Sequence, residues 1–289
     1  MNTSQPGSEY RLIQDITFTA VWGKKTIPTY VVNFHGNGGN TSTPGITVNE
    51  GGVISVLPTA TRNGYQFLGW FTAADGGAQF TSSTRVTSNI TVYAHWKQIV
   101  EVPAKVTGLK TSYNKTKSIK ITWEKAANAK GYHVYRYDSR RNEWKKIKTT
   151  TSTSYKNTGL KEGTNYSYRV KAYNQIGSEV KEGSFSDNLK TASAPAKPSL
   201  KVSQTGSKKV KITWKKTSRC DGVEIYMKVG NKRKYTKIAS KSKSASSLKK
   251  SGLKKGTTYR FRMKRYKRAG SKKIYSSYSS VKKVKINNK

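Results

Sequence analysis

The sequence is short of cysteine, of acidic residues and of long apolar runs. Its single cysteine, Cys220, excludes an intrachain disulfide, and we expect it to be a partly buried small residue rather than a reactive thiol. No stretch approaches the roughly 18 apolar residues of a membrane-spanning helix, so no transmembrane segment is expected. The first thirty residues also lack the charged and apolar regions of a secretory signal, which we expect upstream if the protein is exported.

Acidic residues are heavily outnumbered. The chain has 56 Lys and Arg against 14 Asp and Glu, which gives a formal net charge of +42. The net charge is +1 over residues 1–102, +12 over 103–194 and +29 over 195–289, where 2 acidic residues stand against 31 basic ones. Soluble proteins normally mix both signs on their surface, so this imbalance favours polyanion binding. The alternative is that lysine is simply the solvated residue favoured by an AT-rich genome.

Groups that carry out catalysis are also scarce. The three histidines, His35, His95 and His133, are isolated, and no metalloprotease, redox or serine-hydrolase motif is present. We expect His133 at an outward strand position and His35 in a glycine-rich turn. Asp75 precedes two glycines but supplies one carboxylate where calcium needs about six to eight oxygens. The sequence therefore predicts a protein that is not an enzyme and has no metal or cofactor.

The sequence does contain the pattern of β-strands. Aromatic residues make up 11% of the chain, which is unlike a disordered protein. Polar and apolar residues alternate in Lys117–Trp123, Lys209–Trp214 and Asn165–Ala172, as expected of strands with one buried face. In the third segment the residues predicted to point inward are Tyr166, Tyr168, Val170 and Ala172. We expect a mainly β fold.

Two kinds of internal repeat divide the chain. GLKEGTNYSYRVKAY at residues 159–173 returns as GLKKGTTYRFRMKRY at residues 252–266, an offset of 93 residues. ITVYAHW at residues 90–96 has an earlier counterpart in ITFTAVW at residues 16–22, an offset of 74. The chain is therefore predicted to be a series of small domains of two types.

Four motifs occur in order between Tyr30 and Lys97: VVNFHGNGG, PTATRNGYQFLGW, a glycine pair and ITVYAHW. This block resembles the internalin B-repeat, also called the Listeria–Bacteroides repeat. The resemblance implies a small β-grasp-like domain at residues 28–98, of a type found in bacterial surface proteins, with residues 1–27 as the truncated end of a preceding repeat. The aromatics predicted to form its core are Tyr65, Phe67, Trp70, Tyr93 and Trp96.

The remaining sequence contains two predicted strands, one ending in Trp123 and the other in Trp214. An L-x-x-G-T-x-Y motif follows each of them. Residues 103–192 and 198–289 thereby each resemble a fibronectin type III domain, with linkers at 99–102 and 193–197. This implies two immunoglobulin-like β-sandwiches, each with a tyrosine corner in which the Tyr hydroxyl bonds to upstream backbone. The second, strongly basic copy departs from the first, because Arg265 replaces Ala172 and Asp221–Val229 reads as a weak central strand.

The basic second copy is the candidate binding site. If Tyr259, Phe261 and Met263 point inward, the intervening cations point outward on the same strand, at a spacing of about 6.5–7 Å. A neighbouring strand is expected to add to this face, and a strand of the opposite sheet to carry two further lysines. The predicted polyanion-binding residues are Arg260, Arg262, Lys264, Lys228, Tyr226, Tyr266, Lys209 and Lys211.

These observations predict a non-catalytic segment of a bacterial cell-surface or secreted protein that acts in adhesion and spacing. The expected partners are acidic surface polymers or host glycans, such as teichoic acid, glycosaminoglycan or extracellular DNA, and possible protein partners at exposed strands. Location outside the cell or at the cell wall is implied. One alternative is a spacer region of a larger secreted hydrolase acting on polysaccharide or cell wall. Sequence-specific nucleic-acid binding is not expected, because no such motif is present.

Overall fold

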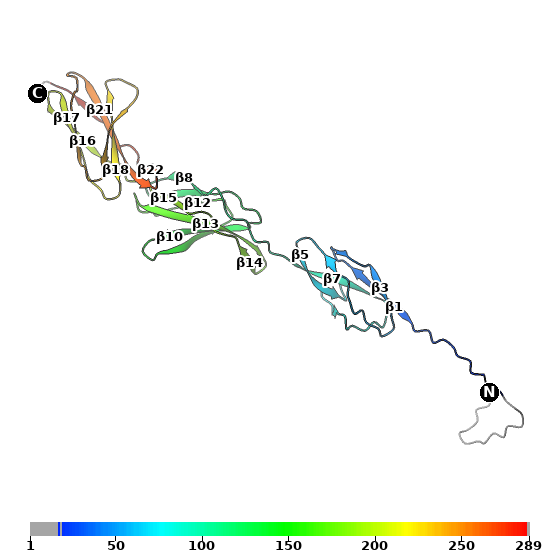
Figure 1. The fold of residues 1–289 in the computed structure, drawn as a ribbon. Coiled ribbons are helices and arrows are strands. Elements are labelled where there is room, and N and C mark those ends of the chain that lie inside the picture. Colours follow the sequence, from blue (N-terminus) through cyan, green and yellow to red (C-terminus); the bar gives the residue numbers. More distant parts are fainter. Residues whose placement is uncertain (1–16, 18, 288–289) are drawn as a thin grey trace. The chain divides into compact units, whose positions relative to one another are not determined.

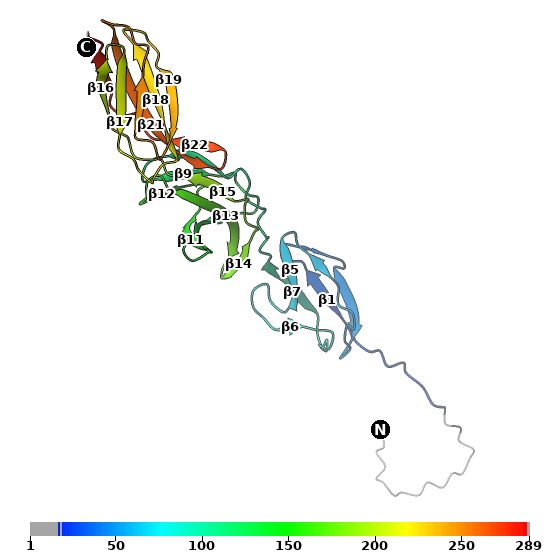
Figure 2. The same cartoon turned by 60° about the vertical axis from the view of Figure 1, so that its left-hand side comes forward.

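A computed structural model of the protein describes residue 17 and residues 19–287, and it divides the chain into two compact units, residues 1–99 and 100–289. The described elements are all strands (Figures 1 and 2). No described helix has the length and apolar character needed to cross a membrane. The predicted truncated repeat at 1–27 lies largely outside the described residues. Within it, residues 19–27 form no strand, and Trp22 is 92% exposed.

The first unit is built on one mixed sheet. Its five strands follow the order β3-β1-β7-β5-β6, in which β1 and β7 run parallel and the other pairs run antiparallel. A separate pair joins β2 to β4. The strands of this unit are β1 (Thr29–His35), β2 (Asn40–Thr41), β3 (Gly45–Asn49), β4 (Ala60–Thr61), β5 (Tyr65–Phe71), β6 (Gln79–Phe80) and β7 (Ile90–Gln98).

The core of this unit differs in part from the predicted aromatic cluster. Trp70 is buried at its centre, and Phe67 and Trp96 pack against it as expected. Tyr65 and Tyr93 are not part of the core. On β7 the residues that alternate with Tyr93 face inward instead, and Tyr93 contacts a histidine on the other face of the sheet. The remaining core positions are filled by Val32, Phe34, Ile54, Ala60, Phe80, Val86, Val92 and Ala94.

The second unit begins with a sandwich whose two sheets have the orders β12-β9-β8 and β11-β10-β13-β14, with β15 also paired to β13. On β13 the predicted inward residues Tyr168, Val170 and Ala172 are fully buried. The strands of this sandwich are β8 (Lys110–Asn114), β9 (Ile119–Thr122), β10 (Gly131–Asp138), β11 (Glu143–Thr150), β12 (Ser154–Asn157), β13 (Asn165–Ile176), β14 (Glu179–Glu182) and β15 (Leu189–Ala192).

The C-terminal sandwich repeats this topology. Its sheets have the orders β16-β17-β20 and β19-β18-β21-β22, with β23 paired to β21. Leu253, Phe261 and Met263 are among its buried core residues. The strands of this sandwich are β16 (Leu200–Gly206), β17 (Lys209–Trp214), β18 (Gly222–Val229), β19 (Thr236–Ser242), β20 (Ser247–Lys250), β21 (Thr258–Ala269), β22 (Lys272–Tyr275) and β23 (Lys282–Lys285).

Both sandwiches contain the predicted tyrosine corner. The Tyr166 hydroxyl accepts a hydrogen bond from the backbone N–H of Lys161 at 2.9 Å. The Tyr259 hydroxyl accepts the equivalent bond from Lys254, also at 2.9 Å. Each bond satisfies a backbone donor at the loop before the long strand, and so fixes where β13 and β21 begin.

The expectation of a weak central strand at Asp221–Val229 is wrong. β18 pairs along its whole length with β21 and also pairs with β19. Val223, Glu224 and Ile225 are all at most 2% exposed. Val223, Ile225, Met227 and Val229 face the core, and the residues between them, including Glu224, lie on the other face, so β18 keeps the period-two alternation of a strand throughout.

The segment between the two sandwiches, predicted as a linker at 193–197, is largely buried at its start. Ser193 is fully buried and its hydroxyl accepts a hydrogen bond from the backbone N–H of Thr164 at 3.1 Å. Arg265, which replaces Ala172, donates from Nη2 to the carbonyl of Lys215 at 2.9 Å and from Nη1 to that of Ala196 at 3.5 Å. Because the second copy has an arginine at this position, the segment is hydrogen-bonded to the C-terminal sandwich.

Candidate functional site

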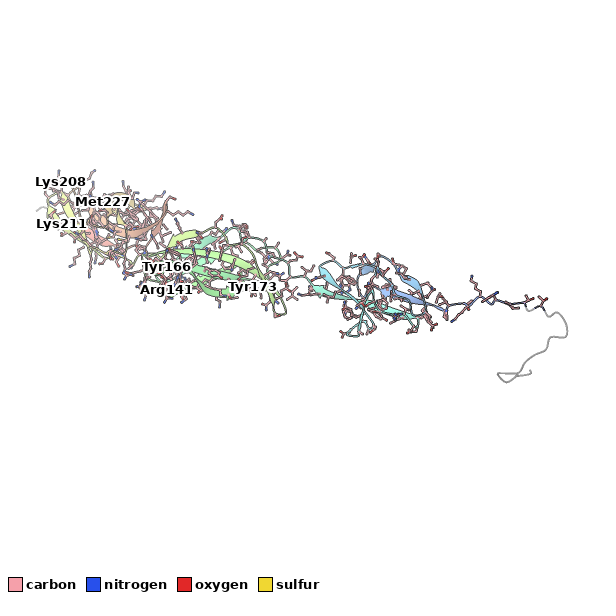
Figure 3. The ribbon with its side chains drawn as sticks, turned by 60° about the horizontal axis from the view of Figure 1, so that its bottom comes forward. Arg141, Tyr166, Tyr173, Lys208, Lys211 and Met227 are labelled. Atoms are coloured by element: carbon pink, nitrogen blue, oxygen red, sulfur yellow. The ribbon has the colours of Figure 1, made fainter. Side chains whose placement is uncertain are left out.

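The structure places the eight predicted binding residues on two different sheets of the C-terminal sandwich. On the first sheet, Arg260, Arg262 and Lys264 lie on β21 beside β18, with Tyr226 opposite Arg262 and Lys228 opposite Arg260. The remaining two lysines lie on β17 in the other sheet, as predicted (Lys211 is labelled in Figure 3). The two groups have different surroundings, so each is described in turn.

The cations on the β18–β21 face are held by aromatic rings of the same domain. The guanidinium carbon of Arg262 lies 4.0 Å from the ring centroid of Tyr235 and 3.8 Å from that of Tyr278. The ammonium of Lys264 lies 3.5 Å from the ring centroid of Tyr275. Contacts of this kind are worth about 0.5–2 kcal/mol each, depending on burial. These cations are therefore part of the folded structure before any ligand binds.

The same arrangement occurs in the preceding sandwich. Arg169, 93 residues before Arg262, lies 3.6 Å from the ring centroid of Phe185 and 4.5 Å from that of Trp144. Phe185 in turn stands 93 residues before Tyr278. An arginine between two aromatic rings is thus common to both sandwiches, whatever their net charge, which identifies it as an element of stability. We call it the arginine–aromatic ladder.

Tyr266 is not available to stack on a ligand, contrary to the prediction. It is only 7% exposed, and its hydroxyl lies against Gly222, where an added Cβ would come within 2.4 Å of it. The ammonium of Lys273 covers its ring at 4.4 Å. The residue alternation of β21 predicted an outward side chain, but the glycine on β18 leaves room for the ring to fold down onto the sheet.

Tyr226 is half-buried and its polar end is already occupied. Its hydroxyl donates a hydrogen bond to Glu224 at 2.7 Å. Burial, followed by this bond to a carboxylate, raises the pKa of Tyr226. Its ring contacts the edge of Tyr278. Only part of its surface is open to a partner.

Of the two acidic residues of the C-terminal sandwich, Glu224 lies on β18 of this same sheet and Asp221 directly precedes that strand. Glu224 accepts hydrogen bonds from Lys273 at 3.0 Å and from Tyr275 at 3.1 Å, besides that from Tyr226. Burial alone would raise the pKa of Glu224, but these three hydrogen bonds outweigh it and the pKa lies below its usual value. Asp221 pairs with Lys267 at 2.8 Å. Both carboxylates thus neutralise cations of the β19-β18-β21-β22 sheet.

The opposite sheet carries cations that nothing neutralises. Lys209 and Lys211 are exposed on β17, and Lys211 lies directly opposite the exposed Lys249 of β20. Lys201 is exposed on the adjacent strand β16, opposite Thr213. Within residues 19–287, no ion pair joins any of these lysines to a carboxylate. We call the outer side of β16-β17-β20 the lysine face.

Like charges placed directly opposite each other destabilise a sheet. The Lys211–Lys249 pair therefore costs the free protein stability, and an anion bound between the two ammonium groups would remove that cost. Because the sheet is built from regular strands, its lysines stand at fixed spacings of about 6.5–7 Å along β17. The arrangement can thus hold a chain of regularly spaced anions.

The histidines and the cysteine are engaged in packing. His95 stacks on Phe71 with ring centroids 4.0 Å apart, and its Nε2 lies 3.0 Å from the carbonyl of Ala73. His133 points outward from β10 as predicted but is covered, stacking on Tyr173 at 4.6 Å. Cys220 is buried, which raises the pKa of its thiol. The described residues contain no group of three or more side chains placed to bind a metal ion.

Comparison with known families matches two parts of the chain. Residues 30–95 match the Listeria-Bacteroides repeat domain, and residues 103–186 match the fibronectin type III domain. Both matched modules are non-catalytic types, and their order agrees with that inferred from the motifs.

Several curated proteins match this chain, and the chain spans 14% or less of the length of each. A poly(3-hydroxybutyrate) depolymerase of Ralstonia pickettii is 37% identical over 73 residues, which cover 25% of this chain and 14% of the enzyme. An alpha-amylase of Niallia circulans is 38% identical over 80 residues, covering 27% of this chain and 6% of the enzyme. A two-domain fibronectin type III segment of chicken tenascin aligns with 62% of this chain and 98% of that segment, at 15% identity and a TM-score of 0.40.

Proposed function

Because the chain joins a Listeria-Bacteroides repeat domain to a fibronectin type III domain and a second sandwich of the same topology, we propose that it is a binding and spacing segment of a bacterial cell-surface or secreted protein. Its C-terminal sandwich binds acidic polymers electrostatically, with teichoic acid, glycosaminoglycan or extracellular DNA as the candidate ligands. In this role the C-terminal sandwich attaches the protein to a polyanionic surface. The other two domains act as a spacer between that attachment point and the rest of the protein.

The observation that carries this proposal is the separation of charge between the two sheets of the C-terminal sandwich. Both of its carboxylates lie on the β18–β21 side, where cations also stack on aromatic rings. The lysine face has neither. A cationic strip with no internal counter-charge binds anions from solution, and polymers most strongly, because many condensed counterions are released at once.

Binding to heparin, measured by calorimetry at several salt concentrations, tests the proposal. The logarithm of the association constant should fall linearly with the logarithm of salt concentration. Replacing both Lys209 and Lys211 by Gln should lower the magnitude of that slope by about one to two, since each contact to a polymer anion contributes somewhat less than one. The matched control is Lys120→Gln in the preceding sandwich, because Lys120 stands 91 residues before Lys211 at the same strand position.

The control variant should leave the slope unchanged. A slope near zero in the unsubstituted protein, or the same loss in the Lys120 variant, would overturn the assignment to the lysine face. The arginine–aromatic ladder offers a further check. Because the β18–β21 cations are already engaged, Arg262→Gln should lower the free energy of unfolding and leave the salt slope nearly unchanged.

A second function is suggested by the two enzymes that share a short stretch with this chain. In this alternative the segment is a spacer of a larger secreted hydrolase acting on polysaccharide or cell wall. The lysine face would then hold the enzyme on an acidic polymer. The full-length gene decides between the two, since this alternative requires a catalytic domain in the same polypeptide.

A further inference from the structure

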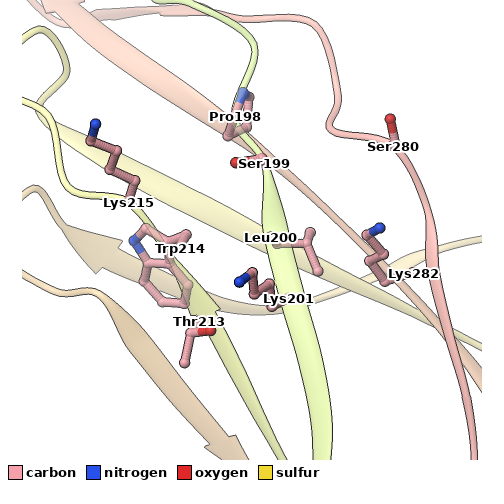
Figure 4. A pocket seen from close by; sticks show the side chains of 9 residues that line it. All are labelled: Pro198, Ser199, Leu200, Lys201, Thr213, Trp214, Lys215, Ser280 and Lys282. Carbon is pink, nitrogen blue, oxygen red and sulfur yellow. The ribbon is translucent and has the colours of Figure 1, made fainter.

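A pocket of about 440 Å³ opens at the edge of the lysine face. Its walls come from the start of β16, the end of β17 and the segment that leads into β23 (Figure 4). Ligand pockets commonly have roughly 300–1,000 Å³, so this one can accept a single sugar-sized unit. The residues that line it are Pro198, Ser199, Leu200, Lys201, Thr213, Trp214, Lys215, Ser280 and Lys282.

The chemistry of this lining is specific. Three exposed lysines, Lys201, Lys215 and Lys282, contribute to it, and no acidic residue does. Within residues 19–287, none of the three forms an ion pair. The rest of the lining is formed by hydroxyl groups of serine and threonine, the largely buried indole of Trp214, Pro198 and Leu200. Ammonium, hydroxyl and indole groups together match an anionic, hydroxylated unit rather than a purely apolar one.

The walls of the pocket are fixed by hydrogen bonds that do not use the lining ammonium groups. The indole N–H of Trp214 donates to the carbonyl of Ala245 at 2.9 Å, which sets the orientation of the ring. Arg265 donates to the carbonyl of Lys215 at 2.9 Å and so holds the strand end in place. A site whose scaffold is already ordered loses less entropy when it binds a ligand.

The preceding sandwich has acidic residues at positions equivalent to two residues of this pocket. There a smaller pocket of about 240 Å³ lies between residues 105–109 and 186–189, and Lys105 pairs with Asp187 at 2.8 Å. Counting from the shared tryptophans, Lys215 stands where that sandwich has Glu124. Counting from Ser186 and Ser279, whose hydroxyls accept equivalent bonds from β13 and β21, Ser280 stands where it has Asp187. Both acids are thus absent from the C-terminal copy.

We propose that the pocket beside Trp214 binds one anion-bearing, hydroxylated unit of an acidic polymer, that is, a sugar or polyol carrying a sulfate, carboxylate or phosphate group. This inference rests on the proposed function and adds a recognition site to it. The polymer continues from the pocket along the lysine face. Lys211 and Thr213 on β17 and Lys215 directly after it occupy every second position and so lie in one row. The lysine face supplies salt-dependent affinity, and the pocket selects the unit.

Two double variants of the full chain test the pocket against the lysine face. Lys215→Glu with Ser280→Asp installs the acids of the preceding sandwich in the pocket. Lys209→Glu with Lys211→Gln changes the net charge by the same amount on the lysine face. The probes are a heparin-derived tetrasaccharide and a glycerol-phosphate tetramer, with neutral maltotetraose as the control ligand. Affinity is measured by calorimetry, and the Trp214 indole N–H signal is followed by NMR.

We expect at least one anionic tetramer to bind saturably and to shift the Trp214 indole signal, while maltotetraose does neither. The tighter of the two tetramers identifies the sulfated glycan or the polyol phosphate as the source of the anion. The pocket variant should lose about tenfold or more in tetramer affinity, as expected when charge-assisted hydrogen bonds are removed. The lysine-face variant should lose only a few-fold while keeping the Trp214 shift.

Equal losses in the two variants, with no shift at Trp214, would overturn the pocket and leave the electrostatic proposal standing. Failure of both the tetramers and full-length heparin to bind the unsubstituted protein would overturn both. Hydrogen exchange of the β17 amides, unchanged in the variants, shows that each still folds.

Discussion

The two sandwiches of the second unit share one fold but use charge differently. Both have a tyrosine corner and an arginine–aromatic ladder. In the first, seven acidic residues are spread among nineteen cations, whereas in the second only Asp221 and Glu224 remain among thirty-one. Both of these carboxylates are used to stabilise one sheet. The comparison shows that net charge is a poor guide to a binding surface until the cations already engaged within the fold have been set aside.

One pair of equivalent positions makes the contrast sharp. Glu224 stands 91 residues after His133, and both lie beside the lysine of the neighbouring long strand, Lys264 and Lys171. In the first sandwich the acid comes instead from β14, where Glu182 pairs with Lys171 and lies 3.4 Å from His133. In the second, the acid is on the central strand and the cation Lys273 comes from β22. The carboxylate at this site thus comes from β14 in the first sandwich and from the central strand β18 in the second.

The largest expected effect comes from removing the buried acid. Glu224→Ala leaves Lys273, Tyr226 and Tyr275 without their acceptor, and should lower the free energy of unfolding of the C-terminal sandwich by about 3–5 kcal/mol. The matched variant His133→Ala leaves no charged group without a partner. It should therefore lower the free energy of unfolding of the first sandwich by a smaller amount. Hydrogen exchange of β18 and β10 amides in the full chain measures both. Equal costs would mean that the two sites are not electrostatically distinct.

Breaking the arginine–aromatic ladder should lower the free energy of unfolding of both sandwiches by a similar amount. Arg169→Ala and Arg262→Ala each remove a guanidinium held between two rings, so each should destabilise its own sandwich by about 2 kcal/mol. Exchange of amides in β13 and β21 reports the two effects separately. If only one substitution destabilises its domain, the ladder is not the shared structural element described above.

The smallest effect is a difference in pH dependence. Burial, and then nearby lysines, lower the pKa of His133 below its usual 6.5. The unfolded chain therefore takes up a proton near pH 6.5 that the folded sandwich does not, so the first sandwich loses stability as the pH falls through this value. Glu224 has a lowered pKa, and its contribution is lost only at more acidic pH. Between pH 7.5 and 5.5 the protection factors of the amides, which correct for the intrinsic pH dependence of exchange, should fall in β10 but not in β18, and His133→Gln should abolish the difference.

Much of the fold could be predicted because its signals are local. Period-two alternation on β13 identified the buried Tyr168, Val170 and Ala172, and the L-x-x-G-T-x-Y motif identified both tyrosine corners. The candidate site was harder to predict. Alternation separated outward from inward residues on β21 but could not show that rings 27 residues before and 16 residues after Arg262, on Tyr235 and Tyr278, would cover its guanidinium. Contacts between distant segments leave no trace in a local pattern.

The pocket could have been suspected from one signal only. Aligning the two sandwiches by their tryptophans and serines shows Glu124 and Asp187 replaced by Lys215 and Ser280, but the sequence does not say that these positions meet. They meet because β16, β17 and the segment before β23 come together at one edge of the sandwich.

The sequence by itself determined the order and type of the domains, the strands with one buried face and the accumulation of lysine toward the C-terminus, since each depends on short-range patterns or on composition. The tertiary structure alone decided which cations remain free. Neutralisation requires a carboxylate or a ring within a few ångströms, and that proximity arises only when strands far apart in the chain pack into two opposed sheets.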